Sequence, residues 1–128
     1  MQGLRNWLFY LGFATLATHE LDAMTQSEWR LLYLLRDLPD PLACDLFVLL
    51  HVPLLALLLW LTFHPRERIR DGSRLALGLF LIVHVGLHLN LQDHPAYSFF
   101  SPLSLGLIYG GGLLGLGYLL VTLAASRR

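Results

Sequence analysis

The sequence predicts an all-α, polytopic membrane protein: a bundle of four transmembrane helices with a short interfacial helix in the first outer loop. The 128-residue chain is 55% hydrophobic and only 14% charged, so it is more apolar and less charged than an ordinary soluble domain. Its apolar residues also gather into four long runs. Each run can cross a bilayer core of roughly 30 Å at about 1.5 Å per residue, and a helix satisfies its own backbone groups in lipid.

The four runs are expected to form a single membrane domain over residues 1–128. A cleaved signal peptide is a competing interpretation of the first run, because Arg5 precedes it and small residues follow near Ala17. The polar cluster directly after this run favours a retained span instead. The predicted spans are residues 4–23, 43–63, 75–91 and 103–125.

The arginines predict the orientation of the spans, since the chain contains no lysine. Arg30 and Arg36 lie between spans one and two, whereas the other seven lie at the two termini and between spans two and three. By the positive-inside rule both termini are cytoplasmic, and residues 24–42 and 92–102 face outward. No basic patch with interleaved aromatic residues indicates nucleic-acid binding. The inner set is Arg5, Arg66, Arg68, Arg70, Arg74, Arg127 and Arg128.

The first outer loop carries a helix signal. Thr25 and Glu28 have the spacing of a capping box, which predicts a helix that ends near Leu38, before Pro39. We expect this helix to lie along the outer surface as a lid, with Glu28 in a structural role. In the functional alternative, Glu28 turns inward as a metal ligand or a base.

Four histidines fall in the outer half of the bundle. His84 and His88 lie roughly 40° apart on one face of the third span, and His19 and Asp22 lie roughly 60° apart on the first. His51 is at a similar depth in the second span. Each pair can therefore point at one place, and all three spans can contribute to it.

These residues predict a metal site. Ionisable groups inside a bilayer are costly and usually mark a site, and imidazole is the commonest metal ligand. We expect zinc or non-haem iron, with a carboxylate as an extra ligand or catalytic base, and with chemistry on a lipid-soluble substrate. The enzyme would be a metal-dependent membrane hydrolase or oxidoreductase. The expected metal ligands are His19, His51, His84 and His88, and the expected catalytic carboxylates are Asp22 and Glu28.

Two alternatives stay open at this stage. The protein could be a non-catalytic membrane subunit or proton relay, whose histidines exchange hydrogen bonds with Asp22 and with a backbone oxygen freed by Pro53. It could also bind a b-type haem through His51 together with His84 or His88. The first alternative predicts no bound metal, and the second predicts a red protein.

The fourth span is rich in glycine and has no ionisable side chain within the lipid. Small residues at four-residue spacings permit close approach of helices, so this span could form a homodimer contact. The glycines are not a phosphate-binding loop, because no strand precedes them. They are Gly106, Gly110, Gly111, Gly112, Gly115 and Gly117.

The polar positions also have a recognisable order. The segments THELDA with EWR, then LLHVPL, then HVGLH with HPAYSF together resemble a family of small four-span bacterial membrane proteins of unknown function, domain of unknown function 6713. The resemblance covers nearly the whole chain and carries no established activity. It implies that these polar positions belong to one motif set, and that the protein lies in a bacterial inner membrane.

Overall fold

The computed structural model describes residues 1–126, which form four long helices and one short 3₁₀ helix. The all-α prediction is therefore confirmed. Arg127 and Arg128, which the orientation prediction uses, lie outside the described residues. The helices are α1 (Gln2–Thr25), η1 (Glu28–Arg30), α2 (Asp40–Thr62), α3 (Glu67–Leu91) and α4 (Pro102–Ser126).

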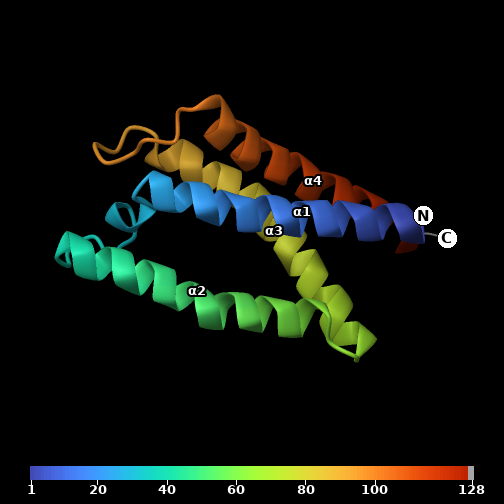
Figure 1. Cartoon of the computed structure of the whole chain (residues 1–128). Helices are drawn as coiled ribbons and strands as arrows, with labels where there is room; N and C mark the ends of the chain where they lie inside the picture. Colours follow the sequence, from blue (N-terminus) through green and yellow to red (C-terminus); the bar gives the residue numbers. More distant parts are fainter. Residues whose placement is uncertain (127–128) are drawn as a thin grey trace.

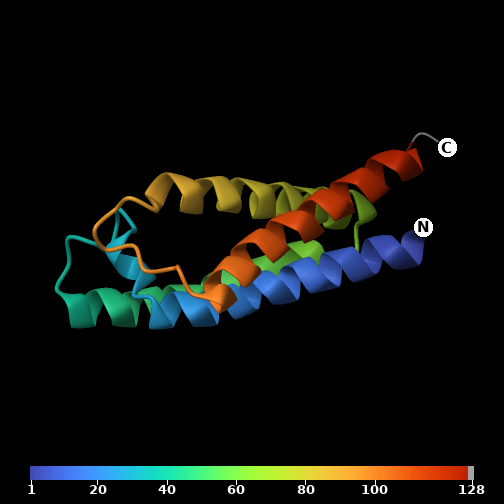
Figure 2. The ribbon, with the colours of Figure 1, turned by 90° about the horizontal axis from the view of Figure 1, so that it is seen from above.

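Helix α4 packs along both α1 and α3, whereas α2 lies to one side (Figures 1 and 2). Helix α1 begins and α4 ends at the same end of the molecule. The connections from α1 to α2 and from α3 to α4 lie at the opposite end, which we call the loop end. The histidines of α1 and α3 are close to this end, because each lies in the last two turns of its helix.

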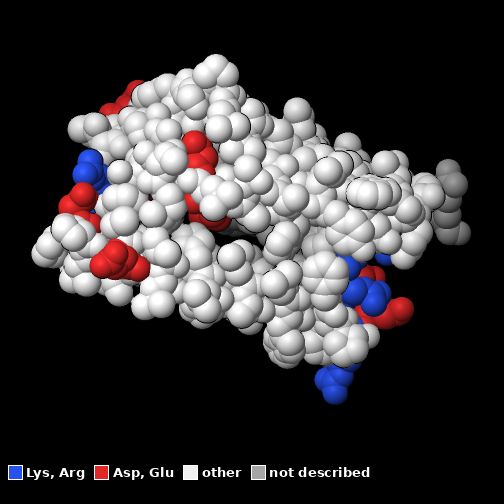
Figure 3. All heavy atoms as spheres, in the orientation of Figure 1, with Lys and Arg blue, Asp and Glu red and all other residues white. Residues whose placement is uncertain are grey.

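Three of the helices in residues 1–126, namely α2, α3 and α4, are long and apolar enough to cross a membrane. This is consistent with a membrane protein. Helix α1 is not among them, because polar residues interrupt its apolar run at both ends, including Arg5 and Asn6 at the start and Glu20 and Asp22 near the finish. On the face drawn in Figure 3, the arginine side chains gather at the two ends of the molecule.

Helices α3 and α4 cross closely at glycines. A Cβ atom added at Gly115 would lie 2.5 Å from the backbone oxygen of Gly78, and one at Gly112 would lie 2.6 Å from Val85 Cγ2. The absence of side chains therefore lets the two backbones approach. Gly110, by contrast, has nothing within 4 Å of its added Cβ, and the homodimer through α4 stays a prediction.

Helix α3 begins well before the predicted third span. Of the arginines expected in the inner loop, only Arg66 precedes the helix. Arg74 is buried: its Nε donates to Thr62 O at 2.9 Å and its Nη1 to Asn6 Oδ1 at 3.3 Å, with the guanidinium 4.4 Å from the Phe9 ring centroid. This side chain thus links α1, α2 and α3 at the end away from the loop end.

The interfacial helix predicted from Thr25 to Leu38 does not form, and the capping-box interpretation was wrong. Thr25 Oγ1 donates back to Asp22 O at 2.8 Å and so does not cap a new helix. Ser27 then takes a left-handed conformation with φ 55°, which interrupts the helical path. Only η1 and a series of turns follow in this segment.

The Asp40 carboxylate, at the start of α2, accepts hydrogen bonds that hold η1 in place. Trp29 is buried, and its Nε1 donates to Asp40 Oδ1 at 2.9 Å. Arg30 donates to both oxygens of Asp40, each at 2.8 Å. These bonds position η1 over the loop end of α1, so Glu28, its first residue, faces the histidines.

Candidate metal centre

Three of the predicted ligands meet at the loop end: His19 from α1 with His84 and His88 from α3. One ring nitrogen from each lies within 4.8 Å of the others, and all three side chains are buried. We call these residues the histidine cluster. The four-residue spacing on α3 brings His84 and His88 to one face, as the sequence predicts.

The nitrogen positions suit a shared ion. His84 Nε2 and His88 Nε2 are 3.2 Å apart. Two nitrogens bound at about 2.0–2.1 Å to a tetrahedral zinc ion are separated by about 3.3 Å. His88 Nδ1 lies 3.1 Å from Tyr97 Oη, and when this Nδ1–H donates to the hydroxyl, Nε2 keeps the lone pair that a metal needs.

Four buried polar atoms around the cluster have no hydrogen-bond partner among the described residues. They are both ring nitrogens of His19, one carboxylate oxygen of Asp22 and one of Glu28. Glu28 Oε2 is 3.9 Å from His19 Nε2, too far for a hydrogen bond but close enough to share a ligand. Because burying such atoms unpaired is costly, a cation bound among them would be stabilising.

Glu28 has turned inward, as in the functional alternative that the sequence left open. Burial raises the pKa of its carboxyl to about 7, and the Glu20 and Asp22 carboxylates add to the rise while His51 opposes it. A carboxyl with this pKa is partly protonated near neutral pH. It is therefore suited to accept or give a proton in a reaction at the cluster.

The connection between α3 and α4 covers the histidine cluster with aromatic side chains. Phe99 is fully buried, and its ring centroid lies 5.5 Å from that of His19 and 4.8 Å from that of His88. Tyr97 is also buried and contacts His88. Sequence reasoning did not assign either residue to the site. The only signal was the aromatic content of the segment that follows Pro95.

The structure does not bring His51 into the histidine cluster. Its Nδ1 is 2.6 Å from Phe47 O, and its Nε2 is 2.8 Å from Glu20 Oε2, so both ring nitrogens are engaged. Glu20 of α1 therefore points to α2. Pairing of His51 with a cluster histidine across a haem therefore finds no support in this arrangement.

The comparisons with known proteins identify the family. The family of unknown function DUF6713 matches residues 5–125, so the chain belongs to it. No curated protein and no solved structure matches the chain. The resemblance expected from the THELDA, LLHVPL and HVGLH segments is therefore confirmed, and the function has to be argued from the site.

Proposed function

We propose that this member of the DUF6713 family is a membrane protein that binds one zinc or non-haem iron ion at the histidine cluster. His19, His84 and His88 supply the imidazole ligands, and Asp22 or Glu28 serves as a further ligand or as a base. The observation that carries the proposal is the set of buried, unpartnered polar atoms around three converging imidazoles. One cation bound among them would take a ring nitrogen of His19 as a ligand and offset the charge of the neighbouring carboxylates.

The chemistry would follow from the geometry of the ligands. Three protein nitrogens leave a coordination position open, and an ion with an open position activates water or polarises a substrate oxygen. The Glu28 carboxylate is placed to accept the proton of that water. A substrate that reaches a site inside a membrane protein is expected to be soluble in lipid, so the proposed reaction is a metal-dependent hydrolysis or oxidation of such a molecule.

The proposal includes a bundle of four spans in a bacterial inner membrane with both termini cytoplasmic. Helix α1 lies beside α4 along its length and buries Phe9 and Leu16 within the bundle. The two helices pack closely: a Cβ atom added at Gly117 of α4 would lie 3.4 Å from Leu8 Cδ2 of α1. If α4 crosses the bilayer, α1 crosses with it, and the histidine cluster then lies in the outer half.

A metal-free hydrogen-bond network is the second candidate. The 3.2 Å contact between His84 Nε2 and His88 Nε2 is also that of an N–H···N hydrogen bond. In this alternative the cluster relays protons or stabilises an assembly. It leaves both nitrogens of His19 without a partner, whereas a bound ion would take one of them.

Elemental analysis separates the two candidates. The detergent-purified protein should carry close to one zinc or iron ion per chain by plasma mass spectrometry, and the His84→Ala/His88→Ala double variant should carry almost none. His64→Ala is the matched control, because His64 lies at the other end of α2 and its Nδ1 only accepts from the Arg66 amide. It should retain the full metal content.

The folded state of each variant is checked by circular dichroism and by elution as a single species in detergent. Metal absent from the wild-type protein, even after supply of zinc or iron(II) to the purified chain, would refute the metal proposal and leave the hydrogen-bond network. Metal retained in the folded double variant would place the ion elsewhere.

A further inference from the structure

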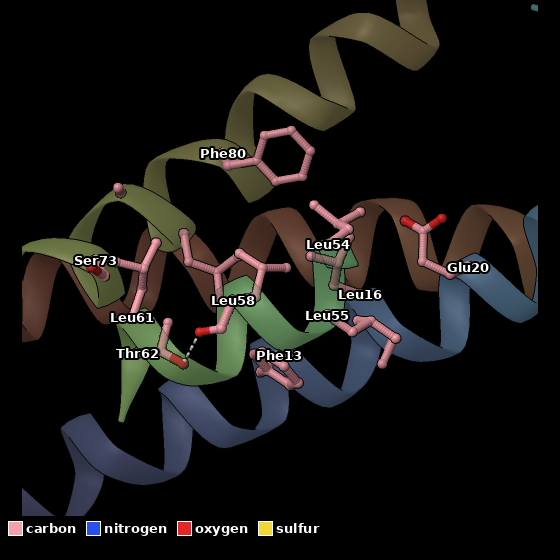
Figure 4. A pocket seen from close by; sticks show the side chains of 13 residues that line it. Phe13, Leu16, Glu20, Leu54, Leu55, Leu58, Leu61, Thr62, Ser73 and Phe80 are labelled. Atoms are coloured by element: carbon pink, nitrogen blue, oxygen red, sulfur yellow. Dashed lines mark hydrogen bonds between the residues drawn. The ribbon is translucent and has the colours of Figure 1, made fainter. Parts of the chain in front are cut away.

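A second feature of the structure is an apolar cavity of about 360 Å³ between α1, α2 and α3. This volume lies within the roughly 300–1,000 Å³ range of small-molecule sites. Its walls are mostly leucine, alanine and phenylalanine side chains from the three helices, with Thr62 and Ser73 at one end and Glu20 at the other (Figure 4). They include Phe13 and Leu16 of α1, Leu54 and Leu58 of α2, and Leu77 and Phe80 of α3.

The cavity is elongated along the helices. On each of the three helices the lining residues extend over seven positions or more, for example from Phe13 to Glu20, and seven positions correspond to about 10 Å. In Figure 3 the visible face is hollowed between α2 and the remaining helices. A long, apolar space with an opening toward the lipid suits an extended aliphatic chain better than a compact ring system.

One end of the cavity, which we call the polar end, carries a carboxylate. Glu20 lines this end (Figure 4), and its carboxylate is paired with His51. Phe47 O and Glu20 Oε2 are both acceptors when Glu20 is ionised, so His51 must then carry a proton on each ring nitrogen. If Glu20 is protonated, it donates to a neutral His51. In both forms the pair has no net charge, which favours a neutral ligand head over a charged one.

The polar end adjoins the histidine cluster. Glu20 directly follows His19 in α1, and the ring of Phe80, which lines the cavity, lies 5.6 Å from the ring of His84. A ligand head at Glu20 is therefore next to the proposed metal ligands. The cavity and the histidine cluster are therefore adjacent.

We propose that this cavity binds the aliphatic chain of a membrane-resident amphiphile whose head is a neutral hydroxyl group, as in a long-chain alcohol. The chain lies among the leucines of α2, and the hydroxyl donates to Glu20 beside the histidine cluster. The inference rests on the proposed function, since it names the substrate class of the metal centre. The cavity itself does not depend on the metal.

The test uses hexadecanol with a diazirine in its chain as a photo-crosslinking probe. The wild-type protein is placed in vesicles of phosphatidylethanolamine and phosphatidylglycerol, irradiated with the probe, and digested for mass spectrometry. We expect crosslinks on the cavity-lining residues of α1 and α3, and competition by excess unlabelled hexadecanol. The same chain with a carboxylate head should label the cavity at least about tenfold less, because the Glu20–His51 pair has no net charge to compensate the buried carboxylate.

Leu58→Trp fills the cavity, and Leu57→Trp is the matched control, because Leu57 does not line the cavity and is 51% exposed. We expect Leu58→Trp to lower labelling of the cavity by at least about tenfold, because the larger side chain takes the space of the probe. Leu57→Trp should leave the labelling unchanged. Ala17→Trp and Ala14→Trp give a second pair on α1, where only Ala17 lines the cavity, should the first pair fail to fold.

Crosslinks that do not saturate, or that fall equally in both members of a pair, would overturn the cavity proposal. Metal content measured on the same samples separates the two proposals. Saturable labelling without metal refutes the metal centre alone, and metal without saturable labelling refutes the chain-binding cavity alone. Equal labelling by the alcohol and the carboxylate would overturn the assignment of the head group.

Discussion

Tyr97 positions His88 from outside the histidine cluster. Its hydroxyl lies 3.1 Å from His88 Nδ1 and both side chains are buried. A hydrogen bond at the nitrogen that does not bind metal fixes the tautomer and the orientation of the ring. The residue therefore belongs to the candidate site although it need not touch the proposed ion.

Tyr97→Phe should weaken metal binding while leaving the fold intact. The ring still fills its place beside Phe99, but the bond to His88 is lost, and loss of such a partner typically costs about 10–100-fold in affinity. Competition titration with a zinc chelator measures the change. Tyr33→Phe is the control, because Tyr33 is 78% exposed. An equal affinity in Tyr97→Phe and wild type would show that Tyr97 only covers the cluster.

Sequence reasoning found part of the site and missed part of it for a physical reason. His19, His84 and His88 could be brought together because helical periodicity fixes which residues share a face. Tyr97 and Phe99 lie in a connection without periodicity, so no spacing rule placed them. The inward turn of Glu28 depends on the left-handed Ser27, a conformation that no residue near it signals.

Among the helices, the contact of α3 with α4 supports the site most directly, because it fixes the helix that carries two cluster histidines. The contact is made through Gly78 and Gly115, whose backbones approach closely. Leu81 packs on the same crossing, one turn before His84. A shift of α3 here would move His84 and His88 relative to His19.

Gly115→Ala should destabilise the protein by about 1–3 kcal/mol, because the added methyl group meets the Gly78 carbonyl and Leu81 Cβ, neither of which can yield easily. Gly110→Ala is the matched control on the same helix. Its methyl group meets nothing within 4 Å, so this variant should be unchanged or more stable by up to about 1 kcal/mol. Thermal unfolding in one detergent compares the two. Equal destabilisation would contradict the close α3–α4 crossing.

The ends of the helices could largely be predicted from the sequence, whereas the rotation of each helix about its own axis could not. The four runs of apolar residues gave the four helices, with α3 extended at its start by charged residues that a hydropathy run leaves out. Helix α2 is apolar on every side, so its sequence does not indicate which face meets α1. The pairing of His51 with Glu20, and with it the cavity, could therefore be found only in three dimensions.

At the scale of the whole molecule, the number of spans decides where the chain termini lie. Four spans place both termini on one side of the membrane, whereas three spans, with α1 outside the bilayer, place them on opposite sides. We expect epitope tags at both termini to survive protease treatment of bacterial spheroplasts. Digestion of the N-terminal tag with survival of the C-terminal tag would contradict the four-span bundle.

An Asp37→Cys variant, exposed at the loop end, should react with an impermeant maleimide from outside in a Cys44→Ala background.

Two features of the molecule adjoin at Glu20. The histidine cluster offers converging nitrogens with unpartnered carboxylates beside them. The cavity between α1, α2 and α3 offers an apolar space that ends at Glu20. In the proposed site, a lipid chain would lie in the cavity with its head beside the ion.

X-ray absorption at the metal K edge tests the proposal that the three cluster imidazoles bind one ion. For the purified wild-type protein loaded with one equivalent of zinc, we expect three imidazole nitrogens at about 2.0–2.1 Å with the outer-shell scattering of histidine rings. A spectrum with only oxygen ligands, or one unchanged in the His84→Ala/His88→Ala variant, would contradict it.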